Sequence, residues 1–422
     1  MNLTLKFPKL ISLYAFLILV IFTALRNVTT LYFVILGFAL LFFLTKYSKN
    51  LILFKASYKS FFIFLYFSFL IILWSFLYEM SFAPLSGVPR LLLMPLVTLV
   101  FIGFLKSERD FDKVYNLVLI CLFIGALSII FQFFFGVITW FADSATRGVL
   151  TRYSSILGSL TVFGSITGYL LIYIFGPLNS LKNVYFRSLF FTLLIFAIAL
   201  SLQKIALLIL FISGVFLFIY NIKFNGLKVK TGNLIALLAI FLSLPVLFLS
   251  SPLIQTYTSS LLTIVFNVDV GSFSSSLVSV NDVGTSSLTL EAITQRLYGF
   301  TLLAYENYGN YIFILGVGLR GGAGVMGMEG ISAHNGVLDL LLIGGPLYIL
   351  SAIYLYCDVQ NTLFKDIKNK LSATFFILNL VFIVVAIFTA GAFFQPSISA
   401  IFWLSVAYAF MKKSKNTVNS EL

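Results

Sequence analysis

Twelve apolar runs, most of them long enough to cross a membrane, constrain this chain more than any other feature. A helix needs about 20 apolar residues to cross about 30 Å of hydrocarbon. The runs fall at residues 10–25, 30–45, 60–78, 91–105, 114–135, 153–176, 188–202, 205–221, 233–250, 333–357, 371–391 and 396–411. Only 10% of the residues are charged and 60% are hydrophobic, which excludes a soluble globular protein. The sequence therefore predicts an all-α polytopic membrane protein with about twelve transmembrane helices.

The distribution of basic residues predicts how the chain is oriented. If the N-terminus is cytoplasmic, most of the 27 lysines and arginines lie on inner connections, as the positive-inside rule requires. Both termini are then cytoplasmic, and residues 1–422 form a single integral membrane domain. No small-residue cleavage site follows the first run, so we expect this run to remain as the first span. The formal net charge of +13 thus reflects membrane orientation and does not indicate nucleic-acid binding.

The few basic residues predicted on the outer side are nearly all arginine. They are Arg26, Arg90, Arg147, Arg152, Lys204, Arg296 and Arg320. Arginine offers a planar fork of donors that suits phosphate or carboxylate, whereas lysine acts as a point charge. This bias predicts a local anion site on the outer face. The alternative is that these side chains reach phospholipid headgroups, which fits Arg26 and Arg90 best. Lys204 interrupts a long apolar stretch, so it needs either the membrane interface or an anionic partner.

One long connection, residues 251–332 between the ninth and tenth spans, is predicted to form a large outer loop. Its first half is rich in Ser, Thr and Val, which is typical of irregular structure. Its second half places Leu290, Ile293, Leu297 and Phe300 at helical spacing, so we expect an amphipathic helix at the membrane surface. A segment with seven glycines follows at residues 316–330, but no Gly-Lys-Ser/Thr follows it and we do not assign a nucleotide loop.

His334 is the only histidine, and it lies where the outer loop meets the tenth span, next to Asn335. A neutral imidazole with a pKa of about 6.5 accepts a proton near neutral pH, so His334 is a candidate general base. The alternative is a helix-cap or interfacial histidine held by backbone groups. Asp339, one turn into the span, either orients a partner or pairs with an outer arginine. No second histidine is present to share a metal ion with His334, and neither a metal nor a cofactor is expected.

Five segments together resemble the bacterial O-antigen polymerase and ligase superfamily in order and spacing. They are "RYSSILGS" (152–159), "SLQK" (201–204), "TQRLYGF" (294–300), "ILGVGLR" (314–320) and "SAHNGVLDLLLIGG" (332–345). The sequence departs from the family pattern at two places. Gln203 and Lys204 stand where the family usually has Ser-Arg, and Ile343 stands where an acidic residue is common.

The resemblance implies a metal-independent glycosyltransferase of GT-C architecture at the outer face of the bacterial cytoplasmic membrane. Its donor and acceptor would be glycans carried by undecaprenyl pyrophosphate. The resemblance implies that Arg296 and Lys204, with Arg147, Arg152 or Arg320, hold the donor pyrophosphate while His334 takes the proton of the acceptor hydroxyl. Asn335 and Asp339 would support this site. The implied partners are the lipid bilayer and a chain-length regulator and flippase of the same pathway, without nucleic acid.

The leading hypothesis is a polymerase that joins lipid-linked repeat units into an O-antigen or a capsular polysaccharide. A close alternative is an O-antigen ligase, which transfers the finished glycan to lipid A-core with the same donor groups. A different class of function, a lipid-linked oligosaccharide flippase or secondary transporter, is also compatible with twelve spans. A purely structural role, with the outer loop as a docking site, predicts that His334 and Arg296 are replaceable.

Overall fold

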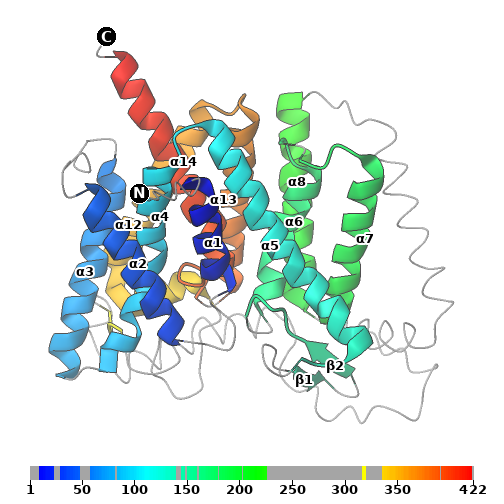
Figure 1. The fold of residues 1–422 in the computed structure, drawn as a ribbon, viewed down its shortest axis with the longest axis horizontal. Coiled ribbons are helices and arrows are strands. Elements are labelled where there is room, and N and C mark those ends of the chain that lie inside the picture. Colours follow the sequence, from blue (N-terminus) through cyan, green and yellow to red (C-terminus); the bar gives the residue numbers. More distant parts are fainter. Residues whose placement is uncertain are drawn as a thin grey trace, which may run out of the picture. The chain divides into compact units, whose positions relative to one another are not determined.

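The structure, a computed structural model, is almost entirely helical over the residues that it describes (Figure 1). The described residues are 9–22, 29–47, 58–80, 83–138, 144–147, 150–158, 161–178, 180–201, 203–225, 316–319, 335–389 and 391–420. They belong to two compact units. The first unit comprises Met1–Cys121 and Thr294–Leu422, and the second comprises Leu122–Ile293.

The first unit is a helical bundle made from both ends of the chain. Its elements are α1 (Lys9–Phe22), α2 (Thr29–Tyr47), α3 (Lys59–Glu79), the short 3₁₀ helix η4 (Ala83–Ser86), α4 (Val88–Phe104), the beginning of α5 (Glu108–Phe135), α12 (Gly336–Lys365), α13 (Lys370–Phe388) and α14 (Pro396–Ser420). Figure 1 shows α1 to α4 next to α12, α13 and α14. Helices from the first and last thirds of the sequence therefore share one core.

The core of the first unit is built on aromatic rings from four helices. Phe64 of α3 stacks on Tyr348 of α12 with ring centroids 5.1 Å apart, and Trp403 of α14 lies 5.6 Å from Phe64. Phe382 of α13 stacks on Phe402 of α14 at 4.7 Å. Interlocked rings of this kind matter in a membrane, because helix association there depends on close packing and not on exclusion of water.

The second unit combines a small β-hairpin with the remainder of α5 and three further helices. The hairpin consists of β1 (Ser144–Arg147) and β2 (Leu150–Tyr153), which pair antiparallel. The helices are α6 (Val162–Phe175), α7 (Val184–Ser201) and α8 (Lys204–Asn225). Both α7 and α8 pack against α6, and β2 packs against α7 (Figure 1).

Six of the described helices are long and apolar enough to cross a membrane. They span Lys59–Leu77, Glu108–Phe135, Val184–Ser201, Ile205–Phe224, Gly336–Lys365 and Lys370–Phe388. Shorter apolar helices lie at Ile11–Phe22, Leu31–Phe42, Val88–Phe104 and Val162–Phe175. Large apolar side chains such as Phe38 and Phe69 are more than half exposed, as expected for surfaces that face lipid. The chain is thus a polytopic membrane protein, as predicted, and its described residues are almost entirely helical apart from the hairpin of β1 and β2.

One predicted span begins later than expected. The sequence predicted a span over residues 153–176, but β2 ends at Tyr153 and α6 begins only at Val162. Residues 154–158 are irregular because their backbone groups bond to side chains of α5, as described below. The predicted ninth span, the amphipathic helix and all of the outer loop except residues 316–319 lie outside the described residues.

Candidate functional site

A polar stripe on α5 holds the irregular segment 154–157 in the second unit. Gly125, Ser128 and Gln132 lie three and four residues apart, so they share one face of the helix. Gln132 Nε2 donates to the Ser154 carbonyl at 2.7 Å, and Ser128 Oγ accepts from the Ile156 amide at 3.0 Å. A methyl group at Gly125 would overlap Leu157, so this glycine allows the close approach. The stripe explains why the chain turns here and does not continue as a helix.

Arg152 ties the hairpin to the end of α7. Its backbone pairs with Ala145 across the hairpin, and its Nε donates to the Ser201 carbonyl at 3.2 Å. Ser201 is the last residue of α7, where helix carbonyls lack intrahelical partners and carry partial negative charge. The predicted segments "RYSSILGS" and "SLQK", 49 residues apart at this contact, therefore lie side by side.

The beginnings of α6 and α8 meet at Gln203. Gln203 Oε1 accepts from the Gly164 amide at 2.7 Å, and Thr167 Oγ1 donates to the Ala206 carbonyl at 3.2 Å. A methyl group at Gly164 would overlap Gln203 Oε1, so only glycine lets the amide seat there. The N-terminal ends of α6 and α8 therefore lie next to each other, and the first residue of α8 is Lys204.

In the first unit, α12 starts with two side chains that the sequence singled out. Asn335 is its N-cap, and its Oδ1 accepts from the Val337 and Leu338 amides at 2.9 and 3.1 Å. Asp339 is 3% exposed, and its Oδ2 accepts from the Gly391 amide at 2.5 Å. Asp339 thereby fastens the connection between α13 and α14 to the first turn of α12. Among the residues that the structure describes, the partner of Asp339 is therefore a backbone amide.

Farther along, α12 is interrupted at Gly345, and residues 316–319 supply hydrogen-bond donors to the carbonyls that the interruption leaves free. Pro346 has no N–H for the Leu342 carbonyl, and Gly345 has non-helical angles of φ 69° and ψ −172°. The Val317 amide donates to the Leu342 carbonyl at 2.6 Å, and the Gly318 amide donates to the Ile343 carbonyl at 3.0 Å. Segments "ILGVGLR" and "SAHNGVLDLLLIGG" thus pair through the backbone.

The same short segment is anchored on α3. Trp74 Nε1 donates to the Gly316 carbonyl at 3.2 Å, and Ser75 Oγ accepts from the Leu319 amide at 2.7 Å. Gly316 and Gly318 both have positive φ, of 70° and 73°. A Cβ at Gly316 would lie 2.6 Å from the Ile343 carbonyl oxygen, so glycine is needed both for the backbone angle and for the close approach.

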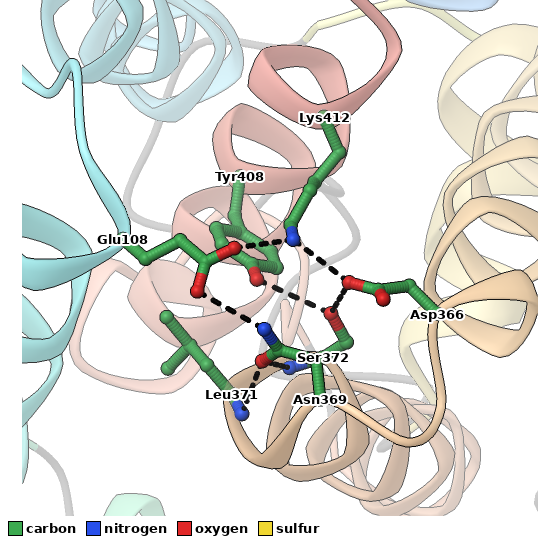
Figure 2. Close-up of polar contacts among 7 residues, drawn as sticks. All are labelled: Glu108, Asp366, Asn369, Leu371, Ser372, Tyr408 and Lys412. Carbon is green, nitrogen blue, oxygen red and sulfur yellow. Dashed lines mark hydrogen bonds and ion pairs between the residues drawn. The ribbon is translucent and has the colours of Figure 1, made fainter. Parts of the chain in front are cut away.

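An ion-pair network lies in the first unit near the C-terminal end of α12, the end away from Asn335, and Figure 2 shows its side chains. Lys412, after the apolar part of α14, pairs with Glu108 of α5 and lies 2.8 Å from Asp366 Oδ2, which follows α12. Asn369 Nδ2 donates to Glu108 Oε2 at 3.0 Å. Burial disfavours the Lys412 charge, but the hydrogen bonds to Asp366 and Glu108 outweigh it and raise the pKa of this ammonium above its ordinary value. The network joins the start of α5, the α12–α13 turn and the end of α14.

The structure describes some of the predicted site residues and not others. Asn335 and Asp339 lie together on α12, whereas Arg152 lies beside the α7–α8 turn that leads to Lys204. Arg147 pairs with Leu150 through the β-hairpin backbone. The side chains of Arg147 and Lys204 lie outside the description, as do His334, Arg296 and Arg320 altogether. Among the described residues, no group of three or more His, Cys, Asp or Glu is placed to hold a metal ion.

Sequence reasoning missed Gln203 and Gly391 as parts of these arrangements. Gln203 could have been identified from the sequence, because burying a side-chain amide between two apolar runs costs free energy unless the amide forms hydrogen bonds. Gly391 carried none, since its contact with Asp339 joins residues 52 positions apart.

No protein-family model matches the chain, and no curated protein matches it.

Proposed function

We propose that the chain is a glycosyltransferase that polymerises repeat units carried by undecaprenyl pyrophosphate, at the outer face of the bacterial cytoplasmic membrane. The observation that carries this proposal is the pairing of segments that are far apart in sequence. Arg152 contacts Ser201 in the second unit, and Val317 contacts Leu342 in the first unit. These contacts join four of the five segments that resemble O-antigen polymerases and ligases into two pairs, one pair within each unit.

The proposal includes twelve spans, a GT-C architecture and cytoplasmic termini. Support comes from the order of helix ends in the first unit. The ion-pair network joins the beginning of α5, the turn between α12 and α13 and the end of α14, all of which the basic residues place inside. The contact between Asp339 and Gly391 joins the start of α12 to the turn between α13 and α14. These two sets of ends alternate along the chain, as in-and-out threading requires.

In the proposed reaction, the acceptor hydroxyl oxygen attacks the anomeric carbon of the donor glycan. The new glycosidic bond forms while the bond from that carbon to the pyrophosphate oxygen breaks, and the polyprenyl pyrophosphate leaves with the electron pair. His334 takes the proton of the acceptor hydroxyl, which typically contributes about 10²- to 10⁴-fold in rate. Arg296, Lys204 and the other outer arginines stabilise the charge that builds on the leaving phosphate.

A ligase remains within this proposal as an alternative outcome, because it would use the same donor groups with lipid A-core as the acceptor. A transport function is a second candidate, and the break in α12 favours it. Transporters often build their sites on discontinuous helices whose ends are freed near the middle of the membrane. Here the freed carbonyls of Leu342 and Ile343 are taken by Val317 and Gly318, which argues for a fixed bend instead.

The experiment that tests the proposal uses purified protein in nanodiscs with lipid-linked repeat units and no added metal. A polymerase gives a ladder of longer lipid-linked glycans, and the ladder is absent for His334→Ala and Arg296→Ala. Arg26→Ala, which removes an outer arginine assigned to headgroups, is the matched control and keeps the ladder. No ladder, but transfer to lipid A-core when it is supplied, would mean a ligase. Neither product, with glycan export intact in cells carrying the two alanine variants, would favour transport or a structural role.

A further inference from the structure

The side-chain amide of Gln203 has one atom that forms a hydrogen bond and one that has no partner among the described residues. Its Oε1 accepts from the Gly164 amide, and because only an oxygen can accept this bond, the orientation of the side chain is settled. Nε2 is buried and has no acceptor among the residues that the structure describes, and Gln203 is only 4% exposed. Buried amide nitrogens almost always donate a hydrogen bond, so this one indicates a missing acceptor.

The surroundings of Nε2 favour a negatively charged acceptor. The amide lies between the first turns of α6 and α8, which run parallel, since Gly164 meets Gln203, Thr167 meets Ala206 and Leu171 lies near Gly214. Two helix N-termini therefore point the positive ends of their dipoles to one place. Their first amides have no intrahelical acceptor, a usual feature of anion sites.

The described first turns of α6 and α8 hold no acidic side chain that would neutralise this positive potential, and the acceptor at the Gly164 amide is the neutral Oε1 of Gln203. Lys204 adds a positive charge at the first position of α8, where an acidic residue would be the stabilising choice. A lysine at this end is consistent with a bound anion.

We infer that Gln203 donates its Nε2 hydrogen to a phosphate oxygen of an anionic ligand held at the paired N-termini of α6 and α8. The assignment of this ligand to a lipid-linked pyrophosphate rests on the proposed function. An anionic phospholipid headgroup offers the same phosphate oxygens and is the other source. Gln203 is then a binding residue that supplies a directed donor beside Lys204, which by itself is only a point charge.

The test measures binding of farnesyl pyrophosphate to the full chain in phosphatidylcholine nanodiscs by calorimetry, with farnesol as the phosphate-free control. Gln203→Glu is the decisive variant, because a carboxylate keeps an oxygen for the Gly164 amide and loses the donor. We expect the wild type to bind farnesyl pyrophosphate and not farnesol, and the variant to bind about 10- to 100-fold more weakly. Equal Kd values for wild type and Gln203→Glu, or no binding by the wild type, would overturn the inference.

A second measurement does not depend on how the variant folds. Cryo-electron microscopy of the wild type with farnesyl pyrophosphate is expected to show phosphate density within hydrogen-bond distance of Gln203 Nε2. Density elsewhere, or an acceptor from the protein itself on Nε2, would contradict the inference. Nanodiscs that contain phosphatidylglycerol distinguish the two sources of phosphate. If this lipid weakens the binding of farnesyl pyrophosphate to the wild type but not to the variant, the headgroup competes for the site and is its ligand. If the binding is unchanged, the pyrophosphate is the ligand.

The outcomes also separate this inference from the proposed polymerase. Gln203-dependent binding without a glycan ladder would retain the anion site and remove the polymerase. If the wild type forms a ladder, and Gln203→Glu changes neither its rate nor its apparent KM for the donor, the polymerase is retained and the anion site at Gln203 is removed.

Discussion

Gln203 fits between α6 and α8 because residue 164 is a glycine and has no Cβ. Gly164→Ala is expected to push the amide out and to lower the free energy of unfolding by about 1–3 kcal/mol, the usual cost of overpacking. Gly214→Ala is the matched control in α8, where the nearest atom, Leu171 Cδ2, lies 4.0 Å from the added Cβ. Thermal unfolding in detergent measures both, and equal midpoints for the two variants would contradict the packing described at Gly164.

Asp339 gives a second prediction at the scale of single residues. Asp339→Leu leaves the part-buried Gly391 amide without its Asp339 acceptor, which is expected to cost about 1 kcal/mol of stability. Asp339→Asn keeps a side-chain oxygen and is expected to retain most of that stability. The unfolding midpoints of the two variants check this, and similar losses in both would mean that the carboxylate charge matters more than the hydrogen bond.

The segment 316–319 is predicted to hold the bend of α12 through backbone contacts. Gly316→Ala places a Cβ 2.6 Å from backbone atoms of Ile343 and Gly344 and also forces alanine to a φ of 70°. Gly391→Ala forces a similar φ of 64°, but nothing lies within 4 Å of its Cβ. We therefore expect Gly391→Ala to lose about 1 kcal/mol from the backbone angle alone, and Gly316→Ala to lose clearly more. Unfolding midpoints decide between them, and equal losses would show that the close approach carries no weight.

How far the elements could be predicted depends on what specifies each one. Apolar length located the helices, and the polar interruption at Gln203 and Lys204 correctly separated α7 from α8. The start of α6 was placed too early, because the α5 side chains that hold residues 154–157 lie more than 20 positions away. Asn335 stands before an apolar run, which is a usual place for a cap, but the sequence led us to consider a cap role only for its neighbour His334. The partner of Asp339 was not recognisable from the sequence, since a contact between distant turns leaves no local pattern.

For the whole molecule, the predicted threading can be tested by labelling. In a background with Cys121→Ala and Cys357→Ala, Ser276→Cys lies in the predicted outer loop and Lys368→Cys lies next to the ion-pair network. A membrane-impermeant maleimide applied to intact cells is expected to label the first and not the second, because the distribution of basic residues predicts that the network lies inside. Labelling of Lys368→Cys before permeabilisation would invert the orientation and place His334 in the cytoplasm.

The central claim is that this chain forms glycosidic bonds with His334 as the base. The measurement that tests it most directly compares wild type and His334→Ala for the rate at which authentic lipid-linked repeat units are converted to longer lipid-linked glycans. The account predicts a ladder from the wild type and a rate at least about 100-fold lower from a folded His334→Ala protein. A ladder of equal rate from both proteins would contradict the assignment of His334, and no ladder from either would contradict the polymerase itself.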